Sequence, residues 1–134
     1  MGVCSHCSRD VPLKNKYCSN RCQAFKQYKD YIQAWKKSDA NGLRGHHAIT
    51  ISRHVRRYIL EKYDYRCCLC DWSGKNPNTG LWCLEVDHID GNMLNCNETN
   101  LRLLCPNCHS MTSNYRGLNR GKGREWRRNK YVKE

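Results

Sequence analysis

Paired cysteines constrain the fold of this chain more than any other feature of its sequence. The 134 residues include eleven cysteines, and most of these fall into two sets of four. The first set, spaced Cys-x2-Cys-x10-Cys-x3-Cys, is Cys4, Cys7, Cys18 and Cys22. The second set, made of two distant Cys-x2-Cys pairs, is Cys67, Cys70, Cys105 and Cys108. Because Zn²⁺ prefers four sulfur ligands in a tetrahedron, we expect two structural zinc ions.

Zinc would compensate for a thin hydrophobic core. Hydrophobic residues make up 39% of the chain and there is only one Phe, whereas a structural zinc site can contribute on the order of 10 kcal/mol to folding. Cys68, Cys83 and Cys96 are left over, and we expect them to be buried or free thiols.

The N-terminus has no apolar leader and no apolar run approaches the length of a membrane span. These features predict a cytoplasmic protein without a membrane partner, in which cysteines bind metal rather than form disulfides.

The charge of the chain is concentrated at its two ends. Residues 1–60 carry twelve Lys and Arg against three acidic residues, residues 61–114 carry four against seven, and residues 115–134 carry eight against two. Basic arms around an acidic centre favour a polyanion held beside a cation-binding site. We expect nucleic acid as the partner, with double-stranded DNA first and RNA as the alternative. The residues expected to contact it are Arg53, Arg56, Arg57, Arg116, Arg120, Lys122, Arg124, Arg127 and Arg128.

Two helices are predicted before the second cysteine set. In the first, Ser19 or Asn20 caps a helix whose apolar stripe recurs at helical spacing; the stripe is Phe25, Tyr28, Ile32 and Trp35. In the second, Ser52 is the expected cap, and the apolar stripe is Ile51, Val55, Ile59 and Tyr63. The segment between them has no period, and its His46-His47 pair is interpreted as solvated rather than metal-binding.

Two strands and a third helix are predicted farther along. Leu81–Val86 alternates in hydrophobicity, Asp90-Gly91-Asn92 has the composition of a turn, and Leu101–Leu104 is apolar. From Pro106 the chain can enter a helix, because proline suits the first helical position. The expected organisation is a zinc knuckle with a helix at 1–37, a linker at 38–50, a zinc-clamped domain at 51–116 and a basic, mobile tail at 117–134.

The order of polar residues between Leu84 and His109 carries a specific motif. An Asp87-His88 pair is followed by Asn100 before Leu-x-Leu-Leu-Cys, and then by Cys-x2-Cys directly before His109. Over residues 65–115 the chain resembles the HNH endonuclease family, in its Asp-His variant. The resemblance implies an α+β fold with a small zinc-stabilised ββα-metal domain, and metal-dependent hydrolysis of DNA phosphodiester bonds.

Residue roles follow from this resemblance. It implies that Asp87 and His109 hold one catalytic divalent ion, Mg²⁺ or Mn²⁺, and that Asn100 binds across the loop and holds the base in place. His88 is the candidate general base, since an imidazole with a pKa of about 6.5 is mostly neutral near pH 7. Neighbours in a strand point to opposite faces, so Asp87 and His88 share a site only if the strand ends or bends there.

Several alternatives stay open. Asn97 competes with Asn100, Asn114 is a substitute ligand for His109, and Arg102 is the basic residue nearest in sequence that could neutralise the transition state. The motif residues could instead hold another structural zinc. A non-catalytic zinc module that binds nucleic acid is the alternative function. One centre cuts one strand, so a monomer would nick and a homodimer could cut both. The compact build suggests a phage or mobile-element origin.

Overall fold

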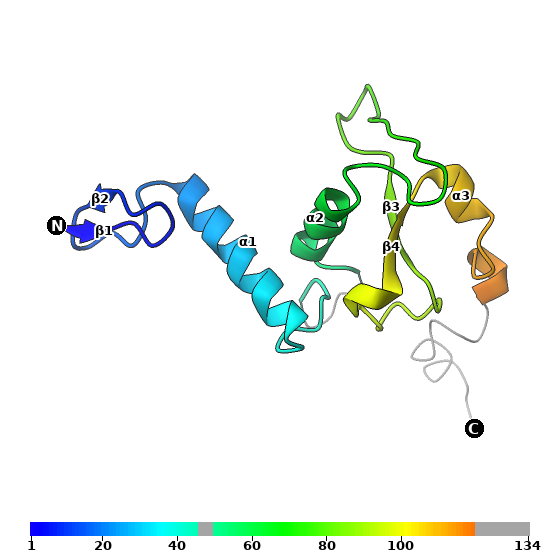
Figure 1. Ribbon diagram of the computed structural model, residues 1–134, viewed down its shortest axis with the longest axis horizontal. Coiled ribbons are helices and arrows are strands. Elements are labelled where there is room, and N and C mark those ends of the chain that lie inside the picture. The colour runs from blue at the N-terminus through cyan, green and yellow to red at the C-terminus, as the bar shows by residue number, and fades with distance from the viewer. Residues whose placement is uncertain (46–49, 120–134) are drawn as a thin grey trace, which may run out of the picture. The chain divides into compact units, whose positions relative to one another are not determined.

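Two short strands and a helix make up the first of two units into which the chain divides, Met1–Ala40 and Asn41–Glu134 (Figure 1). The computed structural model describes residues 1–45 and 50–119. Strand β1 (Gly2–Val3) pairs antiparallel with β2 (Asp10–Val11). Between them the chain turns tightly, with the N–H of Cys4 donating to Arg9 O and that of Ser8 to Cys4 O.

Helix α1 (Asn20–Lys36) completes the first unit and confirms the predicted cap and stripe. The hydroxyl of Ser19 accepts a hydrogen bond from the N–H of Cys22 at 3.2 Å, so one of the free donors at the helix start is satisfied. The buried positions are Tyr28, Ile32 and Trp35. Phe25 is half-buried, and its ring lies against that of His6 at a tilt of 47°, with 4.6 Å between centroids. That contact ties the helix to the cysteine-bearing turn.

Helix α2 (Arg53–Lys62) and the hairpin of β3 (Glu85–His88) and β4 (Leu101–Leu104) form the core of the second unit. Ser52 caps α2, as expected, by accepting from the N–H of His54. The strands are antiparallel, with Glu85 opposite Leu104 and His88 opposite Leu101. Side chains no more than 1% exposed fill the interior; they are Val55, Ile59, Leu84, Leu101, Leu103 and Leu104.

Short helices flank this hairpin. The 3₁₀ helix η1 (Glu98–Asn100) leads into β4, and α3 (Pro106–Ser110) follows it. Helix α2 contacts β4, and α3 contacts both strands. In the view of Figure 1, α2 and α3 lie on opposite sides of the strands. The unit therefore has a mixed α+β architecture with two strands and a helix next to one cysteine set.

The predicted strand over Leu81–Val86 was wrong in its bounds. Leu81 is 69% exposed, and Trp82 forms only an isolated bridge with Lys75. Pairing starts at Glu85 because the partner strand stops at Leu104, where Cys105 becomes the N-cap of α3. The strand instead runs through Asp87 and ends at His88, and the predicted turn follows, with the N–H of Gly91 donating to His88 O.

The chain returns to the hairpin after α3. A 3₁₀ helix, η2 (Arg116–Asn119), brings the side chain of Asn119 to the turn after β3, where its Nδ2 donates to Gly91 O at 2.9 Å. Residues 46–49 and 120–134 lie outside the described residues, and these include His46, His47 and most of the predicted basic tail. None of the described helices combines the length and apolarity needed to cross a membrane.

Candidate functional site

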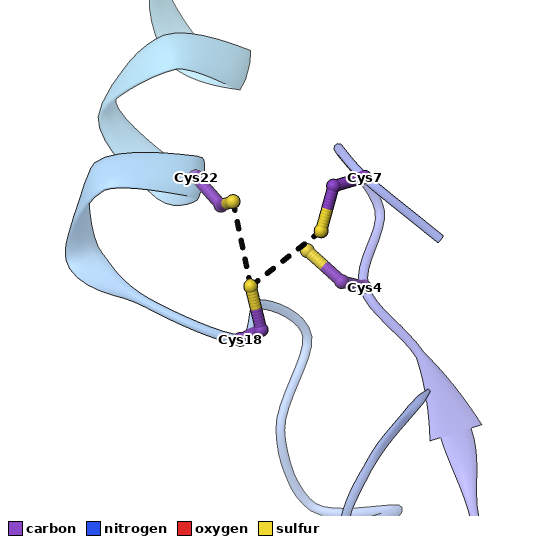
Figure 2. A group of neighbouring side chains, drawn as sticks. All are labelled: Cys4, Cys7, Cys18 and Cys22. Atoms are coloured by element: carbon purple, nitrogen blue, oxygen red, sulfur yellow. Dashed lines mark hydrogen bonds between the residues drawn. The ribbon is translucent and has the colours of Figure 1, made fainter. Parts of the chain in front are cut away.

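The first cysteine set gathers at one point between the β1–β2 turn and the start of α1. The sulfur atoms of Cys4, Cys7, Cys18 and Cys22 lie within 4.8 Å of one another, and Figure 2 shows them pointing toward a common centre. Cys18 Sγ is 3.6 Å from Cys7 Sγ and 3.4 Å from Cys22 Sγ. A tetrahedral zinc with Zn–S bonds of about 2.3 Å separates its sulfurs by about 3.8 Å. The cluster therefore fits a structural zinc ion.

The second set joins the loop after α2 to the start of α3. The four sulfurs of Cys67, Cys70, Cys105 and Cys108 again lie within 4.8 Å of one another, and Cys67, Cys105 and Cys108 are buried. Cys70 Sγ is 3.6 Å from Cys105 Sγ. One pair precedes the β3–β4 hairpin in sequence and the other follows it, so a zinc ion here would join the two segments that flank the hairpin.

Local hydrogen bonds lower the pKa of one thiol in each cysteine cluster. Backbone hydrogen bonds, the largest at Cys7, lower the pKa of Cys4 to about 6 against the opposing effect of burial. Burial raises the pKa of Cys67, but backbone hydrogen bonds at Cys105, Leu69 and Cys70 outweigh it and bring the value to about 6. Metals bind thiolates, and these shifts favour the thiolate at one cysteine of each cluster. In the second cluster the Cys105 side chain has the opposite effect on its neighbour and raises the pKa of Cys108 to about 12.

The side chains of Asp87 and His88 contact different parts of the unit. Asp87 is 7% exposed. Its Oδ2 accepts from Nε of Arg102 at 2.8 Å, and its Oδ1 lies 3.7 Å from Nε2 of His109 on α3. His88 instead turns Nε2 toward Cys96, whose Sγ is 3.5 Å away. The structure thus brings Asp87 and His109 together and places His88 beside Cys96, which the sequence did not single out.

A second carboxylate holds the far side of the His109 ring. Glu85, two residues before Asp87 on β3, contacts Nδ1 of His109 through its Oε2. The imidazole is therefore set between Glu85 at Nδ1 and Asp87 at Nε2. A hydrogen bond from one ring nitrogen to a carboxylate fixes the tautomer and orients the other nitrogen as a ligand. The sequence carried a signal for Glu85, because positions two apart in a strand share a face.

Asp87 and His109 can contribute two ligands to a divalent ion. Their 3.7 Å separation compares with about 3.0 Å for neighbouring ligands of an octahedral Mg²⁺ at 2.1 Å and about 3.4 Å for a tetrahedral zinc. Among the described residues, groups of three or more potential ligands form only at the cysteines. A two-ligand site suits an ion that completes its shell with water and substrate phosphate.

Asn100 closes the loop that follows the Asp-His pair. Its Nδ2 donates to Asp90 Oδ1 at 2.9 Å and to Asn95 O at 2.8 Å, while its Oδ1 accepts from the N–H of Asp90 at 3.1 Å. Asn97, the competing candidate, is exposed and precedes η1. The side chain of Asn114 donates to Ile89 O at 2.9 Å, so that amide is engaged with the backbone beside His88.

The electrostatics of His88 suit a base. The side chain is half-buried, and this burial lowers the pKa of its imidazole, with Asp87 and Asp90 opposing the shift. The neutral ring is therefore favoured. No hydrogen-bond partner for Nδ1 lies within residues 1–45 or 50–119. Arg102 is bonded to Asp87 rather than directed at His88.

The basic residues predicted to contact nucleic acid differ in their surroundings. Arg53 and Arg57 are exposed on α2, and Arg57 pairs with Glu61 at 2.8 Å. Arg56 donates from Nη1 to Leu84 O at 3.0 Å, so part of its guanidinium holds the start of the hairpin. Arg116 is exposed, with its guanidinium over the Tyr115 ring. The others lie outside the described residues; they are Arg120, Lys122, Arg124, Arg127 and Arg128.

Comparison with known proteins gives one short match. A 39-residue stretch of the chain is 51% identical to the H-N-H endonuclease F-TflIV of Escherichia phage T5. The match covers 29% of this chain and 17% of the phage protein, so the chain spans far less than two thirds of that relative's length. No family model matches the chain, and no solved structure matches it.

Proposed function

We propose that this chain is a metal-dependent HNH endonuclease that hydrolyses phosphodiester bonds in DNA. One observation carries the proposal: Oδ1 of Asp87 and Nε2 of His109 approach to 3.7 Å beside the second cysteine cluster. Two strands, a helix and a structural zinc around this pair agree with a ββα-metal domain over residues 51–116. The short likeness to a phage endonuclease supports the same activity, and a phage or mobile-element origin is part of the proposal.

In this proposal Asp87 and His109 hold Mg²⁺ or Mn²⁺. Bound there, the ion supplies positive charge for the phosphate and for the leaving oxygen. Glu85 and Arg102 orient the side chains of the two proposed ligands, His109 and Asp87. Glu85 keeps Nδ1 of His109 occupied, so Nε2 stays available. Arg102 holds Oδ2 of Asp87, which leaves Oδ1 directed toward His109.

His88 takes the proton from the attacking water. The water oxygen bonds to phosphorus, and the bond from phosphorus to the 3′ oxygen breaks with its electron pair going to that oxygen. The 3′ oxygen then takes a proton from solvent water, so the products carry 5′-phosphate and 3′-hydroxyl ends. Burial keeps the imidazole neutral and able to accept a proton. Asn100 holds the loop of Asp90 and Asn95 closed next to the strand end, and so keeps His88 in position.

DNA binding is assigned to the basic ends of the chain. The exposed Arg53, Arg57 and Arg116 belong to the second unit, and η2 brings the start of the tail against the turn at Gly91. Phosphate contacts from such residues supply affinity without sequence preference. This arrangement supports a division in which the ends bind the polyanion and the acidic centre performs the chemistry.

A supercoiled-plasmid assay tests the proposal. Zinc-loaded full-length protein is incubated with plasmid in Mg²⁺, in Mn²⁺ and in EDTA, and the nicked and linear forms are quantified. We expect nicking in both metals and none in EDTA. Binding of the plasmid without any cleavage in either metal would favour the non-catalytic zinc module, and cleavage of an RNA substrate alone would change the substrate class.

A further inference from the structure

The segment after α3 contacts two parts of the candidate site. The ring of Tyr115 packs against the imidazole of His109 in a T-shaped arrangement, with 5.5 Å between centroids. Asn114 Nδ2 donates to Ile89 O at 2.9 Å, and the end of η2 is hydrogen-bonded to the same turn after β3. The segment is therefore held both at a proposed metal ligand and at the turn that follows the proposed base.

Arg116 begins η2 in a backbone conformation that residues with a side chain rarely adopt. Its φ is +47°, in the left-handed region where a Cβ crowds the following carbonyl and glycine is favoured. A residue keeps such a conformation only where its surroundings hold it, and this is common at functional sites. The Cζ of Arg116 lies over the ring of Tyr115, 5.0 Å from the centroid. The attraction between cation and ring face thus holds the guanidinium one aromatic ring away from His109.

The guanidinium of Arg116 keeps hydrogen-bond donors available to a ligand. A ring covers only the flat face of the group, whereas its five N–H donors point outward in the plane. Within residues 1–45 and 50–119 no carboxylate pairs with Arg116. Arg102, by contrast, is bonded to Asp87 at 2.8 Å. Arg116 is therefore a cationic side chain next to the site whose N–H groups are open to an anion.

We propose that Arg116 is a further catalytic residue, which binds the reacting phosphate beside Asp87 and His109. The inference rests on the proposed function for the reaction that it serves. Two N–H groups of a guanidinium match two oxygens of a phosphate group. A cation that is already in place stabilises the charge that develops on these oxygens as water attacks, without reorganising during the step. Arg116 transfers no proton, because a guanidinium stays charged throughout. This role differs from that of arginines that supply affinity alone.

Binding measurements test the phosphate contact without any cleavage. The affinity of zinc-loaded full-length protein for a short DNA duplex is measured over a range of salt concentrations, without Mg²⁺ or Mn²⁺. Arg116→Gly removes the guanidinium and suits the positive φ, so the change adds no backbone strain. Loss of one phosphate contact should flatten the plot of log affinity against log salt by about 0.9. The control is Arg66→Ala, which removes an exposed arginine whose Nη1 lies 3.7 Å from Asp71 and should leave the slope unchanged. An unchanged slope in Arg116→Gly would overturn the inference.

Single-turnover cleavage at saturating plasmid then separates catalysis from affinity. The rate in Arg116→Gly should fall by about 10²–10³, as for other fixed donors aimed at developing charge. Arg116→Lys keeps the charge but not the planar pair of donors, so its loss should be smaller. Zinc content and the Mn²⁺ concentration for half-maximal cleavage should match the wild type in both variants. A wild-type rate in Arg116→Gly, with affinity alone reduced, would contradict the proposal. Absence of cleavage by the wild type would refute the proposed function, whereas the salt slope would still decide the phosphate contact.

Discussion

Nε2 of His109 on α3 lies 3.7 Å from Oδ1 of Asp87 on β3, and its other ring nitrogen is held by Glu85. Glu85 and Asp87 lie on β3, and His109 lies on α3, where Cys105 and Cys108 of the second cysteine cluster are also found. A zinc ion in this cluster would therefore also bear on the position of His109, one of the two proposed ligands of the catalytic ion.

The contact between Glu85 and Nδ1 of His109 gives a prediction for variants of Glu85. Glu85→Ala frees Nδ1 of His109, so the ring can turn and offer a poorer ligand. The Mn²⁺ concentration that gives half-maximal cleavage should rise by about 10–100-fold, with a smaller rise in Glu85→Gln, whose amide oxygen can still accept. Glu61→Ala, which removes an exposed carboxylate from α2, is the control. A metal dependence in Glu85→Ala equal to that of the wild type would remove Glu85 from the site.

Metal content follows from the two cysteine clusters. Protein dialysed against a mild chelator should retain two Zn²⁺ per chain by elemental analysis, since each cluster offers four sulfurs within 4.8 Å. Cys105→Ser should lose one zinc and unfold the second unit, because Cys105 is both a ligand and the N-cap of α3. Cys83→Ser should retain both ions. A wild type that retains one zinc or none would refute the clamp.

Gly91 is predicted to be irreplaceable for two separate reasons. It has a φ of +74°, and a Cβ there would meet Oδ1 of Asn119 and lie 2.9 Å from Cγ of Asn114. Gly80 has a φ of +69° with nothing within 4 Å, so Gly80→Ala isolates the backbone cost of about 1–2 kcal/mol. Urea unfolding should show a larger loss for Gly91→Ala. Equal losses would mean that η2 does not pack on this turn.

The pH dependence follows from the burial of His88. Burial lowers the pKa of the imidazole, and the charges of Asp87 and Asp90 offset this only in part. The protonated form is the disfavoured one, so the base stays neutral to a lower pH than an ordinary histidine with a pKa of about 6.5. Single-turnover rates should be level above about pH 6.5 and fall below it. The unfolding free energy should fall over the same acid range, since the unfolded chain takes up this proton more readily. An acid limb centred above pH 7 would contradict this environment for His88.

Local patterns predicted the elements whose signals are local. Ser19 and Ser52 cap the two long helices as expected, and Pro106 begins α3. Cysteine spacing predicted both metal clusters, because ligand pairs in short turns need little help from the rest of the fold. The bounds of β3 could not be predicted in this way, since they depend on where its partner strand stops, at Leu104.

The candidate site likewise contains residues that local sequence patterns pointed to and residues that they did not. The motif pointed to Asp87 and His109, which lie 3.7 Å apart in the structure, and Glu85 would have followed from the correct strand bounds. Cys96 carried no such signal, because it lies in an irregular loop whose path is set by the hydrogen bonds of Asn100 to Asp90 and Asn95. Arg56 was predicted to contact phosphate, and its bond to Leu84 O shows a structural use that charge patterning cannot reveal.

Replacement of His88 tests the account most directly. Single-turnover cleavage of supercoiled plasmid in Mg²⁺ is compared between the wild type and His88→Ala, with zinc content and DNA affinity measured on the same samples. His54→Ala, which removes a half-buried histidine from α2, is the control. The account predicts a loss of about 10²–10⁴ in rate for His88→Ala, with two zinc ions and DNA binding retained. Wild-type cleavage by a folded His88→Ala protein would contradict the assignment of the base and the mechanism built on it.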